Sequence, residues 1–118
     1  MFNFFSRRKD DKKIEDAMVI IGKALILNGY SSEDANRIAQ HALNQIIDDD
    51  SKDLPTPWVL AVISMHKLKT AIKNIPDPDV QSVIPDLKEI IDLSMNNALH
   101  EASSTDRATL DLIAKDNS

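Results

Sequence analysis

The 118-residue chain has no cysteine and only two glycines. Without cysteine, disulfides, thiolate metal sites and cysteine nucleophiles are all excluded. A small domain without disulfides suits a reducing compartment, so we expect a cytoplasmic protein. Gly22 and Gly29 each stand alone, and therefore no glycine-rich phosphate-binding loop can be read from the sequence.

Long apolar runs are also missing. The longest, residues 17–27, has eleven residues and includes Lys23, whereas a helix needs about 20 apolar residues to cross a bilayer. This run follows a charged segment, as the core of a signal peptide does, but four acidic residues break up that segment and no small-residue cleavage pattern follows. We expect neither secretion nor a transmembrane anchor.

Aromatic residues are few, and most of them lie at the start of the chain. Beyond residue 5 the only aromatics are Tyr30 and Trp58. The start combines three phenylalanines with a basic cluster that begins at two arginines: Phe2, Phe4, Phe5, Arg7 and Arg8. We interpret residues 1–11 as a Phe-rich, basic N-terminal segment and residues 12–118 as a single α-helical domain. The segment either folds back over the domain, docks on a partner or contacts a membrane surface.

Charge is divided unequally along the chain. The net charge is −5, but residues 1–13 hold five basic and two acidic groups, and residues 14–118 hold nine basic and seventeen acidic groups. An acidic body repels nucleic-acid phosphates and attracts basic partners. We therefore expect no nucleic-acid binding.

Apolar residues recur at intervals of three and four residues, which predicts helices. The predicted ranges are about 12–28, 31–47 and 57–74, a main helix from about residue 84, and a short helix at 107–115. Short connections favour antiparallel neighbours, so the predicted fold is an all-α, single-domain antiparallel bundle of four main helices plus a short C-terminal fifth helix.

Several residues mark the expected helix ends. Gly29 should stop the first helix, Ser31 or Ser32 should cap the second, and Thr56 followed by Pro57 should start the third. The first helix is apolar on nearly all sides, which predicts either the central helix of the bundle or half of a self-association interface. It is therefore our candidate for a homodimer contact.

No catalytic or metal-binding constellation can be read. His41, His66 and His100 fall on three different predicted helices and lack a ligand at the spacing that points two side chains to one site. The acidic run at 48–53 lacks the glycine and the terminal glutamate of a calcium loop. The helix that starts at Pro57 opens with apolar residues, unlike a DNA-reading helix. We predict no enzyme activity, no cofactor and no metal.

These observations predict a small acidic protein–protein interaction module, such as an adaptor or an inhibitor that neutralises a basic toxin or nuclease. The alternative is a peripheral membrane or assembly protein attached through its N-terminus. Besides the N-terminal residues named above, the predicted partner contacts are acidic and lie in one connection and on the fourth helix: Asp48, Asp49, Asp50, Asp53, Asp86, Glu89 and Asp92.

Overall fold

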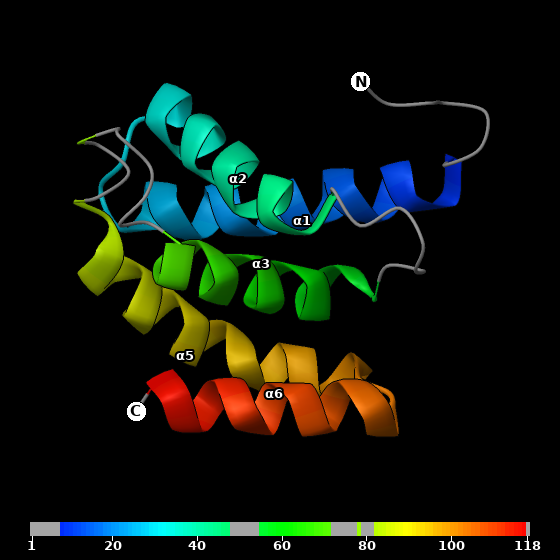
Figure 1. Ribbon diagram of the computed structural model, residues 1–118. Helices are drawn as coiled ribbons and strands as arrows, with labels where there is room; N and C mark the ends of the chain where they lie inside the picture. The colour runs from blue at the N-terminus through cyan, green and yellow to red at the C-terminus, as the bar shows by residue number, and fades with distance from the viewer. Residues whose placement is uncertain (1–7, 48–54, 72–77, 79–81, 118) are drawn as a thin grey trace.

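The computed structural model describes residues 8–47, 55–71, 78 and 82–117, and within these ranges the chain contains helices and no strand. The helices are α1 (Arg8–Leu27), α2 (Ser32–Ile47), α3 (Pro57–Ala71), α5 (Ile84–Glu101) and α6 (Ser104–Asn117). The all-α prediction is confirmed. The helices form one compact unit in which α3 lies between the pair α1 and α2 and the pair α5 and α6 (Figure 1).

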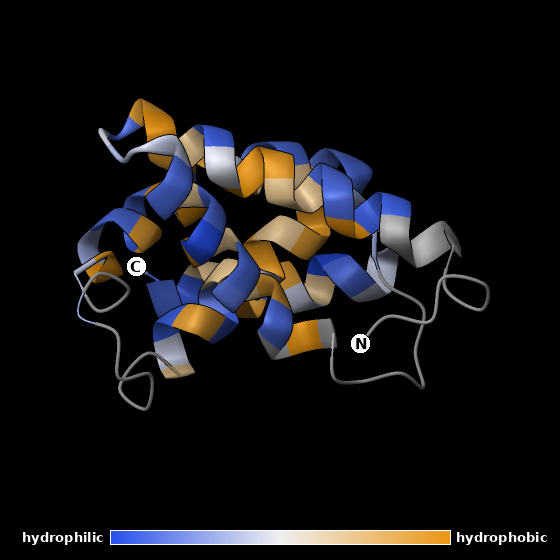
Figure 2. Cartoon of the chain, turned by 90° about the horizontal axis from the view of Figure 1, so that it is seen from above, coloured by the Kyte–Doolittle hydropathy of each residue, from blue (hydrophilic) through white to orange (hydrophobic). Residues whose placement is uncertain are grey.

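The centre of the fold is α3, which contacts each of the other four helices. It buries side chains on most of its circumference: Val59, Leu60, Ala61, Val62, Ser64, Met65 and Leu68. One of the two alternatives for the first helix was the central position, and the structure gives that position to α3 instead. Many apolar residues lie between the helices and many outer turns are hydrophilic (Figure 2), but Val19, Ile26 and Leu27 of α1 are apolar and exposed.

A Schellman motif ends α1, as Gly29 predicted. The Gly29 amide donates to the Ile26 carbonyl at 3.0 Å, and the Tyr30 amide donates to the Leu25 carbonyl at 3.1 Å. Gly29 has a φ of 101°, in the left-handed region that favours glycine. Beyond this turn, α2 packs against α1.

The starts of α2 and α3 are capped differently. Ser31 caps α2 through its Oγ, which accepts from the Asp34 amide at 3.1 Å. Thr56 was expected to cap α3, but its Oγ1 is buried and has no hydrogen-bond partner within the described residues. Instead the Glu101 carboxylate, at the end of α5, accepts from the Trp58 amide at 3.3 Å. A carboxylate at a helix N-terminus also suits the helix dipole.

The C-terminal helix α6 is longer than the predicted 107–115. Ser103 caps it by accepting from the Asp106 amide at 3.2 Å, and its far end is held by Asn117, whose side chain is fully buried. Asn117 Oδ1 accepts from Lys69 Nζ at 2.8 Å, and Nδ2 donates to Asp92 Oδ1 at 2.8 Å and to the Lys88 carbonyl at 2.9 Å. One side chain therefore ties α6 to both α3 and α5.

Candidate functional site

Most of the residues expected to contact a partner lie outside the described ranges. Phe2, Phe4, Phe5, Arg7, Asp48, Asp49, Asp50 and Asp53 belong to this group. Arg8 is the first residue of α1, and the other three, Asp86, Glu89 and Asp92, lie on α5.

Acidic residues are concentrated on α5 and α6. Residues 84–117 carry seven acidic and three basic groups, a net charge of −4. By contrast, α3 carries Lys67 and Lys69 and no acidic residue. Negative charge in the described fold is therefore greatest on the α5–α6 side, which is the side on which a basic partner would be attracted.

The three acidic residues predicted on α5 differ in their surroundings. Asp86 accepts a hydrogen bond from the Tyr30 hydroxyl at 2.5 Å, and Asp92 accepts from Asn117. Glu89 is exposed, and its side chain forms no hydrogen bond or ion pair with another described residue. Glu89 is thus the one of the three whose charge is not engaged inside the described fold.

The Tyr30–Asp86 hydrogen bond joins the turn after α1 to the first turn of α5. Burial, together with the hydrogen bond to the Asp86 carboxylate and the negative charge of that group, raises the pKa of Tyr30 to about 12. The phenol consequently keeps its proton, and its hydroxyl remains a donor, to a higher pH than in a free tyrosine. This contact holds the two helices together.

Another polar contact links α3 to α6. His66 Nε2 lies 2.8 Å from Asp116 Oδ2, and this hydrogen bond, with the positive charge of a protonated His66 ring, lowers the pKa of the Asp116 carboxyl. Within the described residues, no three histidine or acidic side chains gather in an arrangement that could hold a metal ion. The interaction of His66 is therefore with one carboxylate of a neighbouring helix.

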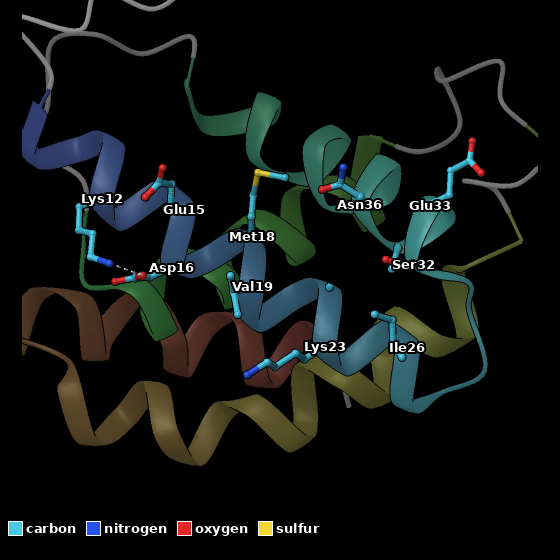
Figure 3. A pocket seen from close by; sticks show the side chains of 12 residues that line it. Lys12, Glu15, Asp16, Met18, Val19, Lys23, Ile26, Ser32, Glu33 and Asn36 are labelled. Atoms are coloured by element: carbon cyan, nitrogen blue, oxygen red, sulfur yellow. Dashed lines mark ion pairs between the residues drawn. The ribbon is translucent and has the colours of Figure 1, made fainter.

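A groove runs along the outer face of α1 beside the start of α2 (Figure 3). Its apolar part includes Met18, Val19, Gly22 and Ile26. Val19 is 52% exposed and Ile26 is 46% exposed, so the groove is open surface and not a closed cavity. The opposite side of α1 is the one that faces the core, through Ile14, Ala17, Ile21 and Leu25.

Charged side chains border this apolar strip. Lys12 and Asp16 form an ion pair at 3.2 Å near one end, and Glu15 and Lys23 lie on either side of Val19 along α1 (Figure 3). From α2, the groove is lined by Ser32, Glu33, Ala35 and Asn36. An apolar strip with a charged border resembles the core and rim of a protein–protein interface.

Comparisons with known proteins give no relative of this chain: no family model, no curated protein and no solved structure matches it. Across the residues that the structure describes, every helix is too short or too polar to span a bilayer.

Proposed function

We propose that this protein is a non-catalytic protein–protein interaction module that binds a basic partner through the acidic side formed by α5 and α6. The observation that carries the proposal is the separation of charge, with a net charge of −4 on residues 84–117 beside an α3 that is basic. Opposite charges steer association and select the partner more than they add affinity. An adaptor and an inhibitor of a basic protein both fit this description.

Glu89 and Asp111 are the residues on which to test the proposal. Both are exposed, and neither side chain forms a hydrogen bond or ion pair with another described residue. Glu89→Gln with Asp111→Asn removes two negative charges without disturbing a described contact. A matched control, Gln40→Lys with Asn44→Lys on the exposed surface of α2, changes the net charge by the same amount elsewhere.

The experiment begins with partners that immobilised wild-type protein retains from host extract at low salt and releases at high salt. Each partner is then purified and titrated against the three proteins by calorimetry. We expect the Glu89→Gln, Asp111→Asn variant to bind about 2- to 30-fold more weakly, since it loses two exposed ion pairs that each contribute about 0.2–1 kcal/mol. The control should bind close to wild type. Equal weakening of both variants would assign the effect to net charge and reject a site on α5 and α6.

The alternative function is attachment of the protein to an anionic membrane or an assembly through its start. It is favoured by a described core that is aliphatic, with Tyr30 and Trp58 only partly buried against it, while the three phenylalanines stand at positions 2, 4 and 5. Co-sedimentation with anionic vesicles should be lost when Phe2, Phe4 and Phe5 are replaced by serine. Equal sedimentation of the two proteins, or none by either, would reject attachment to lipid.

A further inference from the structure

Gly22 is a residue that the fold of the single chain does not require. It lies in the interior of α1 and, unlike Gly29, does not have a positive φ. Apart from the nearby backbone of α1 itself, a Cβ added at Gly22 would meet no atom of the described residues within 4 Å. Glycine inside a helix costs about 0.5–1 kcal/mol relative to alanine. Neither the backbone conformation nor packing among the described residues explains why it stands here.

The surroundings of Gly22 indicate what could require a missing side chain. Val19, Gly22 and Ile26 are spaced by three and four residues, so they form one stripe on the outer face of α1. Val19 and Ile26 are each about half exposed, whereas Ile21 and Leu25, on the other side of the helix, are fully buried. Gly22 is therefore a depression in an exposed apolar stripe, where a second helix can approach closely.

The charges beside the stripe are complementary to those of a second, antiparallel copy of α1. Glu15 lies four residues before Val19 and Lys23 lies four residues after it, and the three share one side of α1. If two copies of α1 pair antiparallel about a two-fold axis at Val19, Glu15 of each copy faces Lys23 of the other. A parallel pair would instead set Glu15 against Glu15 and Lys23 against Lys23, which is repulsive.

From these observations we infer that the outer face of α1 binds a second copy of this chain, forming an antiparallel, two-fold symmetric dimer. The axis at Val19 gives two Glu15–Lys23 ion pairs and brings Val19 of each copy within one helical turn, about 4.5 Å along the axis, of Gly22 of the other. At either end, the carbon chain of Lys12 can cover Ile26 of the other copy. The same surface patch serves both subunits, as two-fold symmetry requires.

The contact is of modest size. The stripe from Lys12 to Ile26 extends about 21 Å along the helix, and α2 widens it only through its first turns. Interfaces of this scale belong to weak, reversible complexes. We therefore expect dimers to accumulate with concentration and to dissociate on dilution.

Charge reversal tests the orientation of the pair. Glu15→Lys alone and Lys23→Glu alone each replace two attractions by two repulsions, whereas the double variant restores both ion pairs with the composition and net charge of the wild type. Sedimentation velocity over a concentration series should show each single variant associating about fivefold or more weakly, and the double variant associating as the wild type does. If both single variants and the double variant associate as tightly as the wild type, the proposal is overturned.

Gly22 tests the close approach independently of charge. Gly22→Leu places a side chain where the single chain has open space, so the monomer should keep its helical circular dichroism and its melting temperature, or gain slightly in stability. Its dimer should weaken by at least tenfold because the partner helix can no longer approach.

Three results would overturn the inference. In the first, the wild-type chain remains monomeric at its highest soluble concentration. In the second, Gly22→Leu associates as tightly as the wild type. In the third, the wild type does not self-associate but binds a basic protein, and Gly22→Leu abolishes that binding; the groove would then be assigned to that protein. Substitutions at Glu89 and Asp111 should leave self-association unchanged, so the failure of this proposal and the failure of the α5–α6 proposal are separate outcomes.

Discussion

Replacing Asn117 by alanine should destabilise the fold far more than its place near the end of α6 suggests. The side chain is fully buried and makes three hydrogen bonds, to Lys69, Asp92 and the Lys88 carbonyl, at 2.8, 2.8 and 2.9 Å. Each contributes about 1 kcal/mol net. Alanine's better helix propensity returns about 0.5 kcal/mol, so we expect a loss of about 2–3 kcal/mol.

Asn97→Ala is the matched control, because Asn97 lies on the exposed side of α5 and has no partner among the described residues. Its substitution should leave stability unchanged or raise it by up to about 0.7 kcal/mol, the difference in helix propensity. Urea denaturation followed by circular dichroism gives the free energy of unfolding of both variants and the wild type. A loss below about 0.5 kcal/mol for Asn117→Ala would show that the amide is hydrated and does not join α6 to α3 and α5.

Three further perturbations have expected outcomes. Tyr30 is the only tyrosine, so tyrosinate absorbance should titrate near pH 12 in the folded protein and near 10 in denaturant, and Asp86→Asn should lower the folded midpoint. Because the folded-state pKa is raised, the stabilisation of the fold by the protonated phenol is complete below pH 10 and is lost between about pH 10 and 12. A folded midpoint near 10 would contradict the Tyr30–Asp86 contact. Ile21→Asp or Leu43→Asp should cost more than about 4 kcal/mol and unfold the chain, since each buries an unpaired charge; unchanged thermal melting would show that the inner faces are misassigned. Gly29→Ala should cost about 1–2 kcal/mol through its positive φ alone, because a Cβ there would meet no neighbour; equal urea midpoints would disprove that strain.

Helix ends could be predicted from the sequence because their signals are local. Gly29, Ser31 and Pro57 each act within a few residues of their own position, and the structure places helix ends at or next to them. The central helix could not be predicted in this way. Periodicity shows which residues of a helix favour burial, but which helix is surrounded by the others depends on packing between distant segments. The antiparallel order of the helices stays a prediction.

Buried polar residues were the other feature that sequence patterns could not supply. Ser64 is buried because its hydroxyl donates to the Leu60 carbonyl of its own helix at 2.6 Å, and Asn117 is buried because three partners converge on it from two other helices. Neither residue belongs to an apolar stripe. Such residues become core positions only when the tertiary fold supplies their hydrogen bonds.

For the candidate site, the sequence contained a signal that was only partly interpretable. A first helix apolar on nearly all sides predicted either a central position or a self-association surface, and α1 proves to bury one side and expose Val19 and Ile26 on the other. The importance of Gly22 required the structure, because only the three-dimensional fold shows that a Cβ there has no neighbour among the described side chains. The sequence also could not show that Asp86 and Asp92 are hydrogen-bonded to Tyr30 and Asn117.

The two ends of α5 are marked by the only two residues that absorb strongly in the near ultraviolet and fluoresce. The Tyr30 hydroxyl donates to Asp86 in the first turn, and the Trp58 amide donates to Glu101, the last residue, about 22 Å farther along the helix. Tryptophan emission and tyrosine absorbance therefore report on opposite ends of α5. Coincident unfolding transitions of the two signals would show that the molecule unfolds cooperatively as one unit. Separated transitions would show that one end of α5 unfolds before the other.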